Sequence, residues 1–204
     1  SLGDELPKLH CEVNTLYWAK ALLTMTYNFI DNVIASATSP PPFDIPHLRF
    51  VEAGLALAHS QISKGPVKPK FSGMLCGVYL LEEKIEGGNR AFTKYIHNMD
   101  YEPMMSAGMN GYDIAEFLVF TQHIQYCKTG GLVIILDYHG NRMLLTDPQI
   151  LTDPGADVFS EGNLESTVAL FEKHHKCNRF CKWPGFGLKQ FGSPVTSGHE
   201  SSAL

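Results

Sequence analysis

Four side chains of the kinds that bind metal ions lie close together near the carboxyl terminus, in the stretch FEKHHKCNRFCKWPGFG. They are His174, His175, Cys177 and Cys181. A structural zinc site is tetrahedral and takes four protein ligands, whereas consecutive residues of a helix point about 100° apart. The two histidines therefore cannot both face one ion. A closed site has to draw one ligand from a distant part of the chain, which constrains the whole fold.

Helical periodicity predicts which of the two histidines faces inward. A helix is expected over residues 164–175, and its apolar face carries Leu164, Val168, Phe171 and His175. His174 is expected in solvent. His123, on another predicted helix, is the leading candidate for the fourth ligand, with Cys127 in reserve. The alternative is a buried histidine beside cysteines that act as small apolar residues, and the spacing alone does not separate the two.

The composition indicates a globular protein of one unit. The chain has 204 residues, of which 44% are hydrophobic, and a net charge of −5. Without a basic block, nucleic acid is not an expected partner. No run of about 18 apolar residues predicts a membrane span. Five unevenly spaced cysteines are a poor disulfide framework, so a reducing, cytoplasmic (intracellular) compartment is expected.

Helical and strand-like patterns are mixed along the chain, which predicts an α+β fold. Helices are expected over 4–35, near 92–97, over 112–127 and over 164–175. Strands are expected over 48–59, 74–85, 132–137 and 143–150, with a polar loop over 61–73 and a turn at YHGNR (138–142). The Ser/Gly-rich tail over 192–204 is expected to be disordered.

Two aspartates mark the ends of the last two predicted strands. Asp137 ends a buried strand, and Asp147 follows its partner. If these strands pair through the turn, both carboxylates emerge at the same end of the hairpin. Converging carboxylates suit a magnesium–nucleotide site, and a positioned Asp can orient a substrate hydroxyl. The alternative is that both are ordinary turn residues.

The familiar nucleotide-binding and hydrolase signatures are missing from the sequence. There is no G-x-x-x-x-G-K-[ST], no G-x-G-x-x-G, no G-x-S-x-G and no H-E-x-x-H. The H-R-D, D-F-G and A-P-E set of conventional protein kinases is also absent. A nucleotide site in this chain would therefore have to be of another type.

Several ordered segments together resemble the alpha-kinase family of atypical Ser/Thr protein kinases, in a form similar to fungal kinase-like members. The segments are YLLEEKIEGGNRAFTKYIHN, FTQHIQY, LVIILDYHG, LTDPQI, EGNLE and HKCNRFC. The resemblance implies a two-lobed fold with a structural zinc site in the carboxy-terminal lobe. Residues 1–86 would form a partial amino-terminal lobe with a hinge near 80–87, and 87–191 the carboxy-terminal lobe.

The resemblance also implies a role for individual residues. Glu82 lies on the hinge that faces the adenine, Asp137 takes the place of the catalytic aspartate, and Asp147 that of a magnesium ligand. Lys94 and Asn98 fall after the hinge without an assigned role. The structural zinc ligands implied are His123, His175, Cys177 and Cys181.

Some positions depart from the family pattern. His139 stands where the family has a glutamine that ligates magnesium, and imidazole is a softer donor than an amide oxygen. The chain starts at the long helix, so the first strands of the amino-terminal lobe, with their phosphate-binding loop and ATP-contacting lysine, are expected to be missing. The implied function is transfer of phosphate from Mg-ATP to Ser/Thr of a protein. The alternative is an inactive kinase-like, zinc-stabilised binding module.

Overall fold

The computed structural model of the chain describes residues 2–59, 75–87, 92–98, 100–152, 168 and 170–191. The helices are α1 (Leu2–Ser36), α2 (Tyr112–Lys128), α3 (Phe171–His174) and α4 (Arg179–Lys182), followed by the 3₁₀ turn η2 (Pro184–Phe186). The strands are β1 (Arg49–Phe50), β2 (Ala53–His59), β3 (Leu75–Glu82), β4 (Thr93–Lys94), β5 (Val133–Leu136), β6 (His139–Asn141), β7 (Leu144–Thr146) and β8 (Gln149–Thr152). The predicted α+β class is confirmed. No helix in these ranges is both long and apolar enough to cross a membrane.

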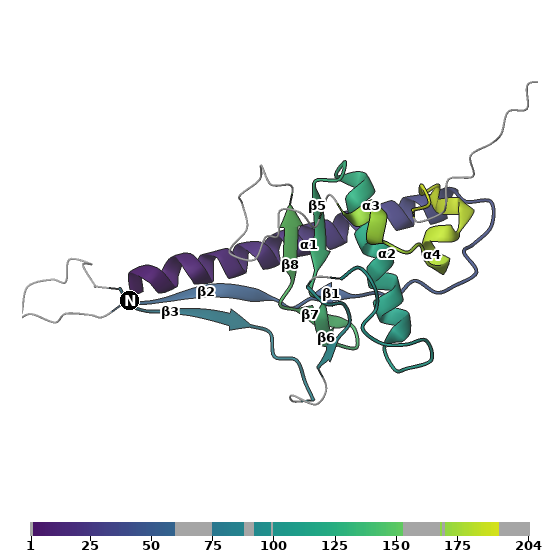
Figure 1. Cartoon of the computed structure of the whole chain (residues 1–204). Helices are drawn as coiled ribbons and strands as arrows, with labels where there is room; N and C mark the ends of the chain where they lie inside the picture. Colours follow the sequence, from purple (N-terminus) through teal and green to yellow (C-terminus); the bar gives the residue numbers. More distant parts are fainter. Residues whose placement is uncertain are drawn as a thin grey trace, which may run out of the picture.

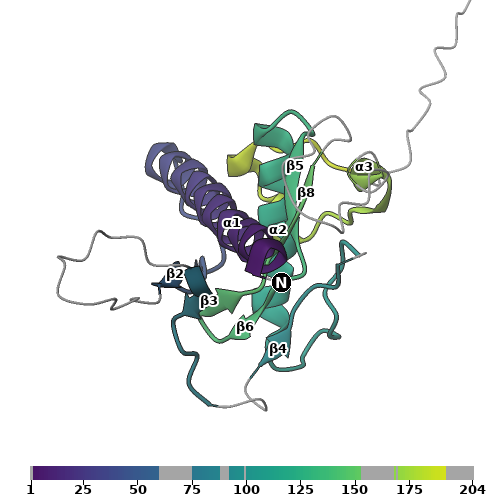
Figure 2. The same ribbon diagram turned by 90° about the vertical axis from the view of Figure 1, so that its left-hand side faces the viewer.

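The helix α1 extends along most of the molecule and confirms the helix expected over 4–35 (Figure 1). The antiparallel hairpin of β2 and β3 lies along its amino-terminal half (Figures 1 and 2). The strand predicted over 48–59 is interrupted at Val51 and Glu52, and its first part, β1, pairs in parallel with β7 instead. The proline-rich segment after α1 is tied back to the helix, because Tyr27 Oη donates to the Pro46 carbonyl and accepts from the Leu48 N–H.

The helix α2 lies in the centre of the carboxy-terminal half and is buried on nearly every side. The predicted apolar stripe of Phe117, Phe120 and Ile124 is confirmed, since all three are fully buried. Burial also includes polar residues, and two of them bond to the backbone of β5. Gln122 Nε2 donates to the Ile135 carbonyl at 2.9 Å, and Gln125 Oε1 accepts from the Ile135 N–H at 2.9 Å. These amide side chains bond to the edge of β5 that faces α2, an edge on which no strand of the described ranges pairs.

A single long antiparallel hairpin runs from β5 to β8. The outer part pairs β5 with β8, and the inner part pairs β6 with β7. The register continues from one part to the other: Leu136 faces Gln149 and His139 faces Thr146, leaving two residues unpaired on each strand. The predicted antiparallel pairing is confirmed, but the turn expected at 138–142 is wrong. The chain reverses at Arg142 and Met143, and 139–141 form a strand.

The β5–β8 pair separates two hydrophobic clusters. Ile135 and Ile150 face the main core, which also contains residues of α1, α2 and α4. Ile134, Leu136 and Leu151 face a smaller cluster with Tyr101, Val168, Phe171 and Phe191. Both faces of this pair are therefore buried, as the continuous apolar run LVIIL suggests for a buried strand.

The short helix expected near 92–97 is wrong. Thr93 and Lys94 form β4, which pairs with β6, and the Tyr95 N–H continues the ladder to the Tyr138 carbonyl at 2.9 Å. These strand contacts satisfy backbone groups that a helix would bond internally, so tertiary pairing overrides the local pattern.

The strand expected over 74–85 is confirmed as β3, and the helix expected over 112–127 is confirmed as α2.

Other expectations fall partly or wholly outside the described residues. Of the helix expected over 164–175, the described part contains the single turn α3. The loop over 61–73, the segment EGNLE and the tail over 192–204 lie outside the described ranges.

The close packing of β6 against the chain reversal predicts a sensitive glycine. A Cβ at Gly140 would collide with the backbone carbonyl oxygen of Leu144. We expect Gly140→Ala to lower the free energy of unfolding by about 2–3 kcal/mol, because overpacking forces the backbone to shift. Gly54→Ala is the matched control, since nothing lies within 4 Å of its added methyl group. Urea unfolding measures both, and equal stability of the two variants would contradict this packing.

Candidate functional site

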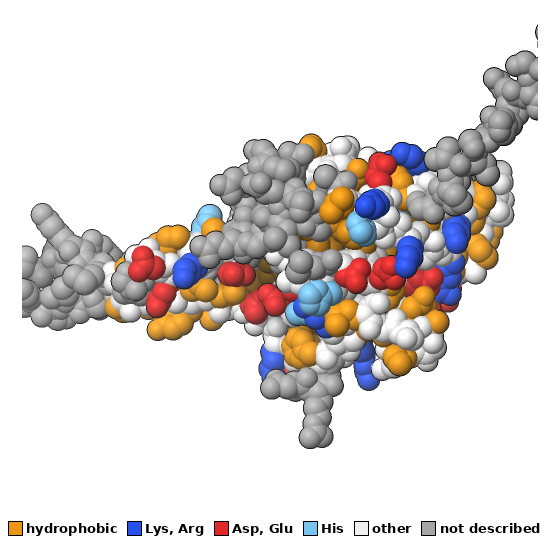
Figure 3. Space-filling model, in the orientation of Figure 1, with side chains coloured by type: hydrophobic (Ala, Val, Ile, Leu, Met, Phe, Trp, Pro, Cys, Tyr) orange, Lys and Arg blue, Asp and Glu red, His pale blue; other side chains and the backbone are white. Residues whose placement is uncertain are grey.

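A cleft of about 360 Å³ opens between the β2–β3 hairpin and the middle of the long β5–β8 hairpin. Apolar side chains of Leu16, Leu80 and Ile85 line it together with four carboxylates, those of Glu12, Glu82, Glu83 and Asp147. Its volume is in the range of small-molecule sites. In the space-filling view, acidic side chains and histidine gather in this middle region of the molecule (Figure 3).

The carboxylates of the cleft differ in what they face. Glu83 is engaged by Arg49, whose Nη1 lies 2.6 Å from Glu83 Oε2, and this hydrogen bond lowers the pKa of Glu83 to about 2. Glu82 ends β3, and partial burial raises the pKa of its carboxyl, with further contributions from the charges of Asp147 and Glu12. The cleft is therefore acidic, and it favours ligands that bring cations with them.

Asp137 and Asp147 occupy the interruption in the long hairpin. Asp137 follows β5 and Asp147 follows β7, so both lie at the same level of the hairpin, as expected if the two strands pair. Each has a positive φ, 54° at Asp137 and 51° at Asp147. Left-handed backbone at a residue other than glycine costs energy and is concentrated at functional sites, and aspartate tolerates it better than most. This conformation ends the outer ladder and redirects both carboxylates.

Two basic side chains contact the aspartates. Lys94 and His139 are direct neighbours on β4 and β6. Lys94 Nζ lies 2.5 Å from Asp137 Oδ1, and His139 Nε2 lies 3.3 Å from the same oxygen. On the other side of the ring, His139 Nδ1 lies 3.6 Å from Asp147 Oδ2. The imidazole thus stands between the two carboxylates, one at each ring nitrogen.

These charge contacts are not aligned as hydrogen bonds. Asp137 Oδ1 and His139 Nε2 are both buried atoms without a hydrogen-bond partner, although each lies within ion-pair distance of the other. Buried polar atoms are normally satisfied, and unsatisfied ones call for an explanation such as a catalytic role or a bound ion. The pair therefore marks a place where the bonding would change when a ligand or metal ion binds nearby.

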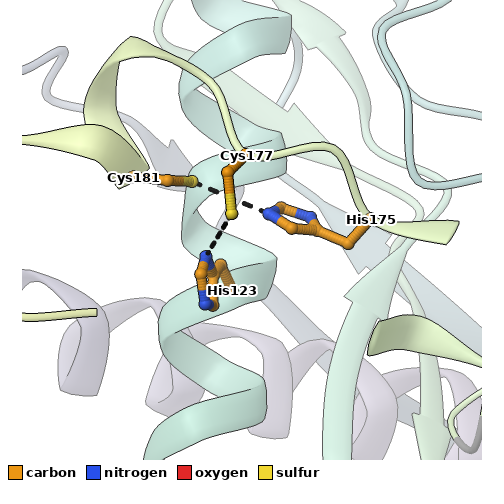
Figure 4. A group of neighbouring side chains, drawn as sticks. All are labelled: His123, His175, Cys177 and Cys181. Carbon is orange, nitrogen blue, oxygen red and sulfur yellow. Dashed lines mark hydrogen bonds between the residues drawn. The ribbon is translucent and has the colours of Figure 1, made fainter. Parts of the chain in front are cut away.

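A second cluster lies on the other side of α2. One ligand atom from each of His123, His175, Cys177 and Cys181 lies within 4.8 Å of the other three (Figure 4). Cys177 Sγ lies 3.8 Å from His123 Nδ1, and Cys181 Sγ lies 3.7 Å from His175 Nε2. Two nitrogens and two sulfurs at such separations match the donor set of a tetrahedral zinc site.

Local structure positions these four side chains. His175 follows α3 in an extended conformation and is fully buried, whereas His174 is exposed, so the expected orientation of the two histidines is confirmed. Asn178 caps α4 by accepting from the N–H groups of Phe180 and Cys181, which places Cys181 in the first turn. Cys127 is exposed and lies outside the cluster.

Three of the four side chains are held in the protonation states that bind a metal ion, and Cys181 would lose its proton when the ion binds. Burial lowers the pKa of His123 to about 4 and that of His175 to about 3, so both imidazoles are neutral at pH 7. A hydrogen bond from Cys181 lowers the pKa of Cys177 to about 6. The same pairing, together with burial, raises the pKa of Cys181. Neutral imidazole and thiolate are the forms that bind metal ions.

Two parts of this architecture were not assigned from the sequence. Lys94 was noted without a role, and its approach to Asp137 depends on strand β4, which was expected as a helix. The Phe191 N–H also donates to Cys177 Sγ at 3.2 Å, a contact from beyond the cysteine motif. A strand reading of 93–98 would have placed Lys94 beside the hairpin, whereas no local pattern predicts the bond from Phe191.

Comparison with known proteins connects these features. The family model described as "Alpha-kinase family" matches residues 19–181 of the chain. The eukaryotic elongation factor 2 kinases of Homo sapiens and Mus musculus are each 42% identical to this chain over 70 residues. The matched stretch is 34% of this chain and 9% of each relative. The protein of the same name from Caenorhabditis elegans is 38% identical over 61 residues, 29% of this chain and 8% of that relative. The chain thus matches about a tenth of the length of these relatives.

Solved structures show the same fold. The crystal structure of the alpha-kinase domain of myosin-II heavy chain kinase A in complex with AMP-PNP superposes with a TM-score of 0.56 at 20% identity, covering 89% of this chain and 56% of that chain. The C-terminal truncated alpha-kinase domain of myosin heavy chain kinase gives a TM-score of 0.57, covering 90% and 59%. The match of the family model over most of the sequence, together with this fold, shows that the chain belongs to the alpha-kinase family.

Proposed function

We propose that this chain transfers the γ-phosphate of ATP to a serine or threonine hydroxyl of a protein substrate. The observation that carries the proposal is the convergence of Lys94, Asp137, His139 and Asp147 at one interruption of the hairpin, beside an acidic cleft. Phosphoryl transfer depends mainly on positioning and on neutralising charge, so it needs oriented carboxylates and cations rather than a strong nucleophile in the protein. The chain's family membership supports the same reaction class.

Asp137 would orient the attacking hydroxyl and accept its proton. Its side chain is held from one side by Lys94, and its left-handed backbone fixes the direction in which it points. The Lys94 ammonium also provides a positive charge next to the reacting groups. An aspartate within hydrogen-bond reach of a hydroxyl contributes through proton transfer and through orientation.

The nucleotide would occupy the cleft with its adenine toward Glu82, at the end of β3. Its phosphates would extend toward Asp147 and His139, which would hold the divalent cation that accompanies ATP. Such a cation would supply positive charge that neutralises the negative charge of the phosphates during transfer. Without it, the four carboxylates of the cleft would repel the phosphates, so the residues present require a cation–nucleotide complex. We also propose that 1–86 and 87–191 are the two lobes on either side of this cleft.

We further propose that His123, His175, Cys177 and Cys181 hold a structural zinc ion. The donor set supports four-coordinate zinc with no open position, which stabilises a fold rather than catalysing a reaction. The ion would join α2 to the segment of α3 and α4. That segment contains only short helices, and it otherwise depends on aromatic packing around Phe171, Phe180 and Phe191.

Replacement of the proposed catalytic carboxylate tests the reaction. Asp137→Asn keeps the shape of the side chain but removes its charge and basicity, and we expect ADP release with a basic test protein to fall by about a hundredfold or more. Asp44→Asn, an exposed aspartate in the proline-rich segment, is the control. Absence of ADP release from the unmodified chain would refute phosphotransfer. A thermal shift with metal–ATP would then indicate an inactive nucleotide-binding module.

Metal analysis tests the zinc proposal. We expect about one zinc ion per purified chain, loss of that zinc in His175→Ala and Cys177→Ser, and unchanged content in His174→Ala, because His174 is exposed next to the buried ligand. Elemental analysis by mass spectrometry is the readout. Zinc retained by His175→Ala, or absent from the unmodified chain, would refute the site.

The pH dependence of the metal-free chain follows from the two buried histidines. Their pKa values in the folded chain, about 4 and about 3, lie below the value near 6.5 of an exposed histidine. Below pH about 6.5 the unfolded chain therefore binds more protons than the folded chain, and stability falls with decreasing pH until both histidines are charged. We expect the chelator-treated chain to lose stability continuously from pH 6.5 to 4 in denaturant titrations. A flat profile over this range would show that these imidazoles are not buried in the neutral form.

A further inference from the structure

The side chain between the carboxylates of Asp137 and Asp147 is the imidazole of His139, which is an unusual ligand for magnesium. Mg²⁺ demands octahedral coordination by oxygen and is commonly held by carboxylates, water and phosphate. Imidazole nitrogen is a softer donor and suits first-row transition metals. The donor set at His139 therefore does not fit Mg²⁺ well, even though the cleft requires a cation.

The spacing of the donors is close to that of two ligands of one metal ion. Neighbouring ligands of an octahedral ion, each about 2.1 Å from the metal, lie about 3.0 Å apart. His139 Nδ1 and Asp147 Oδ2 are separated by 3.6 Å, so the two side chains would approach each other by about 0.6 Å when they share an ion. Asp147 lines the cleft and its side chain is 70% exposed, and His139 lies next to it. An ion held by this pair could therefore also contact a bound phosphate.

The other ring nitrogen is placed to orient the imidazole. His139 Nε2 faces Asp137 Oδ1 at 3.3 Å, and neither buried atom has a hydrogen-bond partner. Histidines that bind metal ions usually donate their second N–H to a carboxylate, which fixes the tautomer and the ring. Lys94 already neutralises Asp137 at 2.5 Å, so Asp137 is better placed to accept from the ring than to bind a second cation. A small rotation of the imidazole would align this contact as the carboxylate–histidine hydrogen bond of such a metal site.

We propose that His139 and Asp147 form a site selective for a transition-metal divalent cation, with Mn²⁺ preferred over Mg²⁺, and that Asp137 orients the imidazole. Mn²⁺ accepts nitrogen and oxygen ligands together and also the octahedral coordination that phosphates and water complete. This inference depends on the proposed function in one respect only, which is that nucleotide phosphates lie beside the ion. The binding of the metal ion itself does not depend on phosphotransfer.

Pulsed electron paramagnetic resonance of Mn²⁺ on the zinc-loaded chain tests the coordination directly. Zinc occupies His123 and His175, so a nitrogen modulation on bound Mn²⁺ would come from another imidazole. We expect this modulation in the unmodified chain and in His174→Gln, the matched control with an exposed histidine outside the cleft, and its loss in His139→Gln. Bound Mn²⁺ without nitrogen modulation in the unmodified chain, or no bound Mn²⁺, would overturn the proposal, and this measurement needs no variant to fold.

Competition between the two ions measures the selectivity. Titration of Mn²⁺ against Mg²⁺ without nucleotide should give a preference for Mn²⁺ that falls by about tenfold or more in His139→Gln, whose amide oxygen is a harder donor. An unchanged preference would overturn the inference. If Mn²⁺ binds through His139 but no ADP forms, the metal site is supported and the proposed activity is refuted. If ADP forms equally with either ion in the unmodified chain and in His139→Gln, the activity is supported and the selectivity is refuted.

Discussion

Two hydrogen bonds connect α2 to the backbone of Ile135 in β5, in the carboxy-terminal half of the chain. Gln122 and Gln125 bond to the carbonyl and the N–H of Ile135, so a helix occupies the place of a neighbouring strand along β5. An unpaired buried peptide group would cost about 1–3 kcal/mol, and these side chains avoid that cost on both sides of the residue. Asp137 follows Ile135 by two residues, so its position depends on this contact.

The helix α2 also contributes His123 to the cluster of two histidines and two cysteines. His123 lies between the two glutamines in the sequence and is fully buried, but it faces His175 and the two cysteines. One turn of α2 thus contacts the strand that leads to the acidic centre and also the segment that contains α3 and α4. The acidic centre and the cluster are therefore connected through adjacent residues of one buried turn of α2.

The sequence predicted much of this arrangement, and the reasons differ between its parts. The patterns of apolar residues at helical spacing in α1 and α2 are long, so the existence and the bounds of these helices were predicted well. The inward orientation of His175 followed from spacing relative to Phe171. The tight turn at Arg142 was missed because YHGNR has turn-like composition, whereas His139–Asn141 is a strand fixed by partners on both sides, β4 and β7. Short elements of this kind depend on contacts distant in the sequence and lack a local signal.

The candidate site also combines features that the sequence predicted with features that only the structure shows. The two aspartates were singled out from their positions at strand ends, but their left-handed backbone and the intervening His139 are visible only in three dimensions. His139 was noted as an imidazole in place of an amide. The structure shows its position between two carboxylates, one at each ring nitrogen, and the proposed choice of cation depends on this position.

If α2 links the cluster to the acidic centre, the amide of Ile135 should report the state of the metal site. Hydrogen exchange of this amide, measured by NMR with zinc and after chelation, is the most direct test. Removal of the ion should loosen α2 and increase exchange at Ile135 by about tenfold or more, since its hydrogen bond to Gln125 then opens with the helix. Unchanged exchange at Ile135, while amides of α3 and α4 exchange faster, would show that the cluster stabilises only its own segment and that the two sites are independent.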